Sequence, residues 1–335
     1  MCGIAGLINL DGLDRGTVTP RLDRAVARLR TRGPDDSGTW YDDHAALGHT
    51  RLAIVDLTAA GHQPMTQGTL ALVYNGEIYN HAQLRAELEG LGETFSGHSD
   101  TEVLIRGWTH WGDDMLPRLN GMFAFAMWDT SDGSLTLARD RFGKKPLSYA
   151  LSGSQLAFAS DLVALEEVEG TQRAVDPDAL RLLFGLRWLP EPWSIAKGVH
   201  HLSPGHVARF DRQGFETRSF VRPETLVAYL DEATAAGALR QRFDAAVAAR
   251  MVADVPVGAY LSGGIDSAAV AAAMVRASDQ VATFTVGFTD VPAYYEERPQ
   301  ARAIADHNQA RTTLEELIGE SLAPVPSNKE SGNDR

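Results

Sequence analysis

Cys2 is the residue whose position most directly suggests chemistry. It is the only cysteine of the 335-residue chain, and it follows the initiator Met1. Removal of Met1, which a small second residue permits, would leave a thiol and an α-amine on the same residue. An α-amine titrates at about pH 8, so part of it is neutral at pH 7 and can take the thiol proton. A small, buried, structural cysteine is the alternative that position alone leaves open.

Charged and amide side chains at three later places could bind a small polar substrate. Arg51 could hold a carboxylate by two parallel hydrogen bonds. Asn75 and Gly76 could place an amide N–H beside a backbone N–H, which are the two donors of an oxyanion hole. Asp100 could accept from a substrate amine. The alternatives are a surface arginine, an Asn-Gly turn and a helix cap at residues 99–100.

A glycine-rich loop provides a different chemistry near the other end of the chain. Ser262-Gly263-Gly264-Ile265-Asp266-Ser267 follows a short apolar strand predicted at 255–261 and precedes an alanine-rich helix ending near Ala277. A strand, a glycine turn with hydroxyls and a helix start together predict a backbone cradle for phosphate. The loop is not a Walker A motif, because no GK[ST] sequence ends it.

The elements that position the first group of residues predict a layered domain. Residues 3–9 read as a buried strand, and Leu22, Ala25, Val26 and Leu29 fall at helical spacing. Further strands are predicted at 70–74, 122–128 and 134–140, with helices after Asn80 and Ser99. Such alternation over residues 2 to about 165 indicates a sandwich of sheets flanked by helices.

Two polar segments of this domain have less specific patterns. The turn at 32–36 carries charges of both signs and is predicted to be solvated. The stretch from Gly48 to Asp56 begins polar and is predicted to become a strand. A proline-rich connector is expected from about 170 to 223, and a second α/β pattern begins near 224. Its strand at 281–288 should lie parallel to the strand before the glycine loop.

Composition excludes several classes of protein. A net charge of −13 argues against broad nucleic-acid binding, which needs clustered Lys and Arg. A single cysteine fits a reducing compartment. The N-terminus lacks the basic region of a secretory signal, and no apolar run approaches the roughly 20 residues of a membrane span. We therefore expect a cytoplasmic protein without nucleic-acid or membrane partners.

Six ordered motifs and the glycine loop resemble the glutamine-hydrolysing asparagine synthetases. The resemblance covers nearly all of residues 2 to about 307. The motifs are Cys2-Gly3-Ile4-Ala5-Gly6, Arg32-Gly33-Pro34-Asp35, His49-Thr50-Arg51-Leu52, Asn75-Gly76-Glu77-Ile78-Tyr79-Asn80, Ser99-Asp100-Thr101-Glu102 and Ala138-Arg139-Asp140-Arg141-Phe142-Gly143, followed by Asp254-Val255-Pro256-Val257-Gly258 and the loop.

The resemblance implies that residues 2–210 are a class II glutamine amidotransferase with the α+β, αββα sandwich of N-terminal-nucleophile hydrolases. Cys2 would attack the carboxamide carbon of glutamine, giving a thioester and ammonia, and water would then release glutamate. Asn75 and the Gly76 N–H would stabilise the oxyanion.

The same resemblance implies how glutamine is held. Arg51 would bind the α-carboxylate, Glu77 and Asp100 would bind the α-amine, and backbone groups of Ile54 and Val55 would line the pocket. The opposite charges of these side chains suit a zwitterionic amino acid.

Residues 224–310 would be a partial α/β, parallel-sheet ATP-pyrophosphatase domain. ATP and Mg²⁺ are the implied cofactors, and aspartate or another carboxylate is the implied acceptor, adenylated and then attacked by ammonia. The residues implied at ATP are Leu261, Ser262, Gly263, Gly264, Asp266, Ser267 and Val286, with Asp266 also associated with the metal.

The chain departs from the family's pattern after Asp306-His307. Residues 311–335 are predicted to be a divergent, flexible tail with one helix at 313–322. Two clear strands are too few to bury the faces of the second sheet alone. Lys144 also stands where the family usually has an aliphatic residue, near the expected contact between the domains.

Three functions follow from these observations. The first is an asparagine synthetase-type ligase, completed by self-association as a homodimer or by a partner chain. The second is a glutaminase subunit with a vestigial nucleotide domain that supplies ammonia to another enzyme. The third, a non-catalytic relative, is disfavoured by Cys2 and its surrounding motifs.

Overall fold

The computed structural model describes residues 1–221, 231–288, 296–308 and 311–317, the last as backbone only. The chain divides into two compact units, Met1–Ala228 and Tyr229–Arg335. None of the described helices combines the length and apolar character that crossing a membrane requires.

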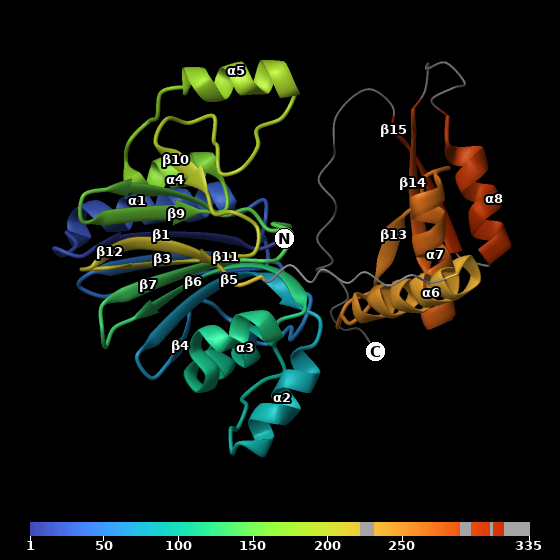
Figure 1. The fold of residues 1–335 in the computed structure, drawn as a ribbon, viewed down its shortest axis with the longest axis horizontal. Helices are drawn as coiled ribbons and strands as arrows, with labels where there is room; N and C mark the ends of the chain where they lie inside the picture. Colours follow the sequence, from blue (N-terminus) through green and yellow to red (C-terminus); the bar gives the residue numbers. More distant parts are fainter. Residues whose placement is uncertain (222–230, 289–295, 309–310, 318–335) are drawn as a thin grey trace, which may run out of the picture. The chain divides into compact units, whose positions relative to one another are not determined.

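The described part of the first unit is a sandwich of antiparallel sheets (Figure 1). One sheet contains β1 (Gly3–Asn9), β2 (Asp36–Tyr41), β3 (Ala45–Arg51), β8 (Ser148–Ser152), β9 (Gln155–Ala159) and β10 (Val199–His201), in the order β10-β8-β9-β1-β3-β2. The other contains β4 (Met65–Gln67), β5 (Leu70–Ile78), β6 (Gly121–Asp129), β7 (Ser134–Arg139), β11 (His206–Asp211) and β12 (Gly214–Ser219), in the order β12-β11-β7-β6-β5-β4.

Helices cover the outer face of each sheet (Figure 1). The first unit contains α1 (Arg15–Leu29), α2 (His81–Gly90), α3 (Asp100–Trp111), α4 (Leu162–Glu169) and α5 (Pro177–Leu186), with short 3₁₀ turns η1 (Ala59–Gly61) and η2 (Gly112–Arg118). Buried residues of α1 and α4 pack on the sheet that contains β1, and those of α2 and α3 pack on the sheet that contains β5. The predicted αββα order of layers is confirmed.

Strand β1 shows why the sequence produces these layers. Ile4 and Ile8 point into the core between the sheets, whereas Ala5 and Leu7 point to the helical side. Side chains alternate across a strand, so a strand that is buried on both faces must be apolar throughout. Gly6 lies in the same strand and must be glycine, because a Cβ there would lie 2.5 Å from the Phe158 ring.

Helix α1 follows the spacing predicted for it. Val18, Leu22, Ala25 and Leu29 are buried, and the Asp14 side chain caps the first turn by accepting from the Gly16 N–H at 3.2 Å. The stripe packs α1 against β1 and β3, which places the helix directly behind the strand that begins after Cys2.

Two sequence predictions for the first unit need correction. The strand expected to develop after Gly48 instead begins at Ala45 and ends at Arg51. The following loop turns at Asp56, whose φ is 56°, so it cannot continue the strand. The predicted domain limit at 210 falls inside β11, which pairs with β12 over residues 206–219, and the compact unit extends to Ala228.

The second unit has a small parallel sheet in its described part. It contains β13 (Gly258–Tyr260), β14 (Ala282–Phe288) and β15 (Arg311–Leu317), in the order β13-β14-β15, with helices α6 (Glu232–Ala249), α7 (Ile265–Ala277) and α8 (Arg298–Asn308). The predicted parallel pairing of the strands before and after the glycine loop is confirmed. A small core contains Leu261, Ala271, Ala301 and Ala305.

The prediction of a flexible tail with a helix was wrong for residues 311–317. Residues 311–317 form β15, which pairs in parallel with β14, and not the start of a helix at 313–322. The described sheet therefore has a third strand that sequence alone did not indicate. The rest of the predicted helix and the flexible tail lie outside the described residues.

Candidate functional site

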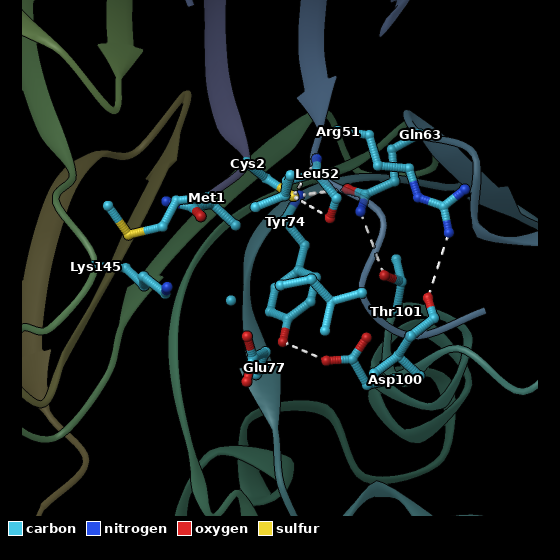
Figure 2. A pocket seen from close by; sticks show the side chains of 14 residues that line it. Met1, Cys2, Arg51, Leu52, Gln63, Tyr74, Glu77, Asp100, Thr101 and Lys145 are labelled. Atoms are coloured by element: carbon cyan, nitrogen blue, oxygen red, sulfur yellow. Dashed lines mark hydrogen bonds between the residues drawn. The ribbon is translucent and has the colours of Figure 1, made fainter. Parts of the chain in front are cut away.

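One pocket of the first unit collects the predicted glutamine-binding residues from separate parts of the sequence (Figure 2). Its lining residues are Met1, Cys2, Arg51, Leu52, Ile54, Val55, Gln63, Tyr74, Asn75, Gly76, Glu77, Asp100, Thr101 and Lys145. All residues predicted for glutamine hydrolysis and binding are in this set. Residues from β3, β5, α3 and three loops therefore face one cavity.

Cys2 lies immediately before β1, and its sulfur faces the pocket. Its Sγ accepts from the Leu52 N–H at 3.4 Å, while its carbonyl accepts from Arg32 Nε at 3.1 Å. Burial raises the pKa of the Cys2 thiol, so the thiol needs a nearby base to become a nucleophile. The hydrogen bonds thus fix the orientation of the thiol, while its burial disfavours the thiolate.

The charged turn at 32–36 holds this arrangement and is not merely a solvated turn. Besides the Arg32 bond to Cys2, the Asp35 carboxylate accepts from the Ala53 N–H at 2.8 Å. A Cβ at Gly33 would lie 2.4 Å from the Thr50 carbonyl carbon, so only glycine fits against β3. The turn therefore connects Cys2 with the strand that carries Arg51 and with the loop after it.

The amine that could act as base lies in the same pocket. In the described chain it belongs to Met1, and burial lowers its pKa, helped by the charges of Lys145 and Arg32. Removal of Met1 would transfer the amine to Cys2, beside its own thiol. Both groups then have the roles that an N-terminal nucleophile requires.

Asn75 and Gly76 lie within β5, not in the turn that an Asn-Gly pair usually marks. Asn75 is 1% exposed, and neither its amide nitrogen nor its amide oxygen has a hydrogen-bond partner among the described residues. A Cβ at Gly76 would lie 2.5 Å from the Met122 carbonyl oxygen, so this position requires glycine. A buried amide without partners costs stability, which points to a ligand that completes it.

Arg51 ends β3 and directs its guanidinium into the following loop. Nη1 donates to the Thr58 carbonyl at 2.9 Å, and Nη2 donates to the carbonyls of Val55 (3.4 Å) and Asp56. A guanidinium has five N–H groups, so Nε–H and one Nη1–H have no hydrogen-bond partner among the described residues. Arg51 therefore orders the loop that carries Ile54 and retains donors for a carboxylate.

Asp100 begins α3, with Ser99 as the cap, as predicted. Its Oδ2 accepts from the Tyr74 hydroxyl at 2.7 Å and from the Ile78 N–H at 2.9 Å. Burial raises the pKa of Asp100, and it raises the pKa of Tyr74 well above its usual value. The Tyr74 hydroxyl thus remains a donor that holds the Asp100 carboxyl at the pocket wall.

Glu77 and Lys145 carry opposite charges into the same cavity. Burial raises the pKa of Glu77 and lowers that of Lys145, while each charge acts on the other in the opposite direction. Figure 2 shows Lys145 and Met1 on one side of the pocket and Arg51 on the other. The pocket therefore presents both cations and carboxylates, with Lys145 beside the N-terminus and Arg51 on the opposite side.

Sequence reasoning missed several residues of this pocket. Gln63 connects the wall, since its Oε1 accepts from the Tyr74 N–H at 2.7 Å and its Nε2 donates to Thr101 Oγ1 at 3.3 Å. Lys145 was overlooked in favour of its neighbour Lys144, which is exposed. The available signal was the spacing: Lys145 follows the Arg139–Asp140 motif by a few residues and precedes β8, whose first three residues are buried.

His49, on β3, is a buried histidine that contacts Tyr74, a residue of the pocket lining. Its Nε2 donates to the Tyr74 carbonyl at 3.1 Å, and its Nδ1 has no partner in the described chain. Burial lowers the pKa of His49 to about 3, so the folded state keeps it neutral at all physiological pH values. The unfolded chain binds a proton at about pH 6.5.

This difference makes the first unit sensitive to acid. The contribution of His49 to the free energy of unfolding is fully present above the pKa of histidine in the unfolded chain. It decreases by about 1.4 kcal/mol per pH unit as the pH falls from about 6.5 towards 3. We expect the free energy of unfolding of wild type to fall by about 2 to 3 kcal/mol between pH 6.5 and 4.5, relative to His49→Gln. Urea unfolding of wild type and His49→Gln at these two pH values measures this difference.

The comparison with the variant is necessary because Glu77 and Asp100 act in the opposite direction. Their pKa values are raised in the folded state, so they favour folding more as the pH falls. Both remain in His49→Gln and cancel in the difference. His206→Gln, at a histidine that is not fully buried, serves as the control for the substitution itself. Equal slopes for wild type and His49→Gln would contradict the prediction.

The glycine loop of the second unit has the hydrogen bonds of an ordered cradle. Ser262 Oγ accepts from the Gly264 N–H at 3.2 Å, and Ser267 Oγ accepts from the Ser262 N–H at 3.2 Å. Gly263 and Gly264 are exposed, and no side chain caps α7. The first-turn N–H groups of α7 can therefore face a phosphate, and the donor set fits that group.

The remaining predicted ATP residues lie at the same end of the sheet. The Leu261 N–H donates to the Phe284 carbonyl at 2.8 Å, so Leu261 adjoins β14, which carries Val286. The Leu261 side chain is buried in the small core, whereas Val286 is 39% exposed. Ligands of open parallel sheets bind at the carboxyl ends of strands, which is where both residues lie.

Metal ligands are sparse in the second unit. No group of three or more His, Cys, Asp or Glu that could hold a metal occurs in the described part of the chain. Asp266 lies exposed in the first turn of α7. Mg²⁺ commonly uses one or two carboxylates together with phosphate oxygens, so a nucleotide-borne Mg²⁺ is compatible with Asp266 alone.

The first unit combines an αββα sandwich with a cysteine just before its first strand, which is the fold expected of the N-terminal-nucleophile type. Residues 1–221 match the family described as "Glutamine amidotransferase domain", and the chain belongs to that family. Residues 238–326 match the family described as "Asparagine synthase". This second match continues past residue 307, so the expected end of the resemblance there was wrong.

Named relatives are similar over both units. Asparagine synthetase [glutamine-hydrolyzing] 3 of Bacillus subtilis is 38% identical over 281 residues, covering 81% of this chain and 45% of that protein. Asparagine synthetase [glutamine-hydrolyzing] 1 of the same organism is 32% identical, covering 100% of this chain and 51% of that protein. The predicted resemblance is confirmed, and the chain spans about half the length of these relatives.

One solved structure that aligns with the chain is the glutamine phosphoribosylpyrophosphate amidotransferase of B. subtilis. It aligns with a TM-score of 0.49 at 18% identity, covering 93% of this chain and 65% of that chain.

Proposed function

We propose that the pocket of the first unit hydrolyses glutamine to glutamate and ammonia, with Cys2 as the nucleophile. The α-amine of residue 2 takes the thiol proton, and the sulfur bonds to the carboxamide carbon. The C–N bond breaks, the amine returns its proton to the leaving nitrogen, and ammonia departs from a thioester. Water then attacks the thioester, with the amine again accepting a proton, and glutamate leaves the restored thiol.

The observation that carries this proposal is the Asn75 amide, which is buried without a hydrogen-bond partner among the described residues in the pocket that contains the Cys2 thiol. The Asn75 amide N–H and the Gly76 backbone N–H would donate to the oxyanion of the tetrahedral intermediate. Preorganised donors of this kind stabilise charge that exists only during the reaction.

The charged lining residues would orient the substrate. The remaining N–H groups of Arg51 would bind the α-carboxylate, and the carboxylates of Glu77 and Asp100 would accept from the α-amine. The backbone at Ile54 and Val55 would line the pocket along the side chain of glutamine. This arrangement favours an amino acid with an amide side chain over a simple amide.

We propose further that ammonia from this site is used by the second unit, in an asparagine synthetase-type reaction. ATP would bind at the loop and adjacent strand ends, and Mg²⁺ would be shared between Asp266 and the phosphates. When bound, ATP would activate a carboxylate, most simply the β-carboxylate of aspartate, as an acyl-adenylate. The nucleotide would be held by Leu261, Ser262, Gly263, Gly264, Asp266, Ser267 and Val286.

A glutaminase subunit that supplies ammonia to another enzyme is the second candidate. It is favoured by α6, where no residue is buried, and by Tyr260 and Ile265, which are 83% and 87% exposed. Such a surface suits contact with the enzyme that would receive the ammonia, whereas a partner chain or a second copy that completed the small core would favour the ligase. In both readings we place the protein in the cytoplasm, consistent with its single cysteine.

Product analysis separates these functions. The purified chain, with its N-terminal residue identified by mass spectrometry, is incubated with glutamine, with and without Mg-ATP and aspartate. Glutamate, ammonia, AMP, pyrophosphate and asparagine are then quantified. The ligase predicts AMP and asparagine in proportion to glutamate, whereas the glutaminase subunit predicts glutamate without AMP. Absence of glutamate from a chain that begins at Cys2 would refute both.

A further inference from the structure

Lys145 is a buried cation of the glutaminase pocket to which the proposed reaction assigns no role. It is 4% exposed and lines the cavity that contains Cys2, Glu77 and the N-terminus (Figure 2). Its backbone is fixed, since its N–H donates to Asp140 Oδ2 at 3.0 Å and its carbonyl accepts from Arg139 Nε at 2.7 Å. The side chain is therefore placed in the pocket by a rigid segment.

The ammonium of Lys145 has no hydrogen bond or ion pair with any of the described residues. Glu77 lines the same pocket and its charge acts on Lys145, but no ion pair joins the two. Almost all of the Lys145 side chain is enclosed by protein, while its Nζ opens onto the pocket, and lysine rarely occupies such a position. A cation retained in this position therefore indicates an electrostatic use within the pocket.

The N-terminal amine and the Cys2 thiol are the groups on which a nearby cation has most effect. The charged groups that face them are Arg32 from the turn before β2, Arg51 from β3, Glu77 from β5, Asp100 from α3 and Lys145 from the segment before β8. The carboxylates favour a protonated amine and an uncharged thiol. A cation opposes both effects, because it disfavours an ammonium and favours a thiolate.

We propose that Lys145 is a positioning residue that keeps the α-amine of residue 2 unprotonated and stabilises the negative charge that forms on Cys2 Sγ. It acts through these two groups and makes no contact with glutamine. The proposal rests on the proposed glutamine hydrolysis for its rate effects, but its effect on Cys2 reactivity can be measured without glutamine.

The direct test is alkylation of Cys2 by iodoacetamide between pH 5.5 and 9.5. Because Cys2 is the only cysteine, the loss of free thiol reports this one group. We expect Lys145→Met to shift the alkylation profile upward by about one pH unit, which slows alkylation at pH 7 about tenfold. Lys145→Arg should restore a profile close to wild type, because it retains the charge.

Lys144→Met is the matched control, since the same substitution is made at the exposed neighbouring lysine. It should leave the profile unchanged. Lys145→Gln is measured in parallel as a second neutral variant that keeps a polar end, and circular dichroism establishes that each variant is folded. An unshifted profile in a folded, neutral variant at position 145 would overturn the proposal.

Steady-state kinetics with glutamine test the same inference in another way. Loss of Lys145 should lower kcat at pH 7 and move the rising limb of the pH profile upward, with KM nearly unchanged. A higher KM with an unchanged kcat would overturn the proposal, because it would mean that Lys145 contacts the substrate. If wild type does not hydrolyse glutamine, the proposed function fails, while the alkylation profile still decides the role of Lys145.

Discussion

Cys2→Ala is expected to abolish glutamine hydrolysis, lowering kcat by a factor of the order of 10⁴ or more. Alanine has no group that can form the thioester, and the pocket has no second cysteine to replace it. The α-amine would remain, but an amine acting only as a base leaves water as the nucleophile. Release of glutamate and ammonia from saturating glutamine, followed at pH 7.5, measures the loss.

The loss must be separated from unfolding and from damage to the second unit. Cys2 is only half-buried, so truncation should leave the thermal midpoint nearly unchanged. If the chain forms an amide with added ammonium salt in place of glutamine, that activity should persist in Cys2→Ala. A variant that still hydrolyses glutamine at a substantial fraction of the wild-type rate would show that another group is the nucleophile.

Much of this site was predictable, because its residues are held by short motifs with distinctive chemistry. Cys2, Arg51 and Asp100 each stand at the end or start of a recognisable element, Asn75 belongs to a distinctive Asn-Gly pair, and the fold brings all four into one pocket. The residues that were missed depend on contacts between distant segments. Gln63 connects β5 to α3, and nothing in its local sequence indicates that its amide is directed inward.

The secondary structure was likewise predictable where local sequence decides it, and not where contacts with distant strands decide it. Strand β1 and helix α1 have patterns that determine both their type and their buried faces. Strand β15 does not: residues 311–317 have the sequence Arg-Thr-Thr-Leu-Glu-Glu-Leu, whose second half favours a helix. Pairing with β14 along its whole length overrides that preference. Such an override depends on a neighbour that sequence periodicity does not reveal.

Asn75→Ala is expected to lower kcat for glutamine about 10²- to 10³-fold, the usual loss for one oxyanion-hole donor. The Gly76 N–H would remain as the second donor, so activity should persist well above that of Cys2→Ala. KM should change little, because the amide would contact the oxyanion and not the ground-state zwitterion. Initial rates over a range of glutamine concentrations separate the two parameters.

The same substitution should have an unusual effect on stability, and this connects the site's chemistry with its energetics. Asn75 carries a buried amide without a partner in the described chain, so its removal should leave the free energy of unfolding unchanged or raise it.

Asn80→Ala provides the matched control. The Asn80 amide donates to the Arg118 carbonyl at 3.0 Å and accepts from the Asn120 N–H at 2.9 Å, so its loss should lower stability and leave kcat unchanged. Should Asn75→Ala instead lose stability and retain kcat, the amide would serve the fold and the oxyanion assignment would fail. A catalytic amide differs from a structural one in this respect: it lowers the stability of the fold, because its N–H donor is used only during the reaction.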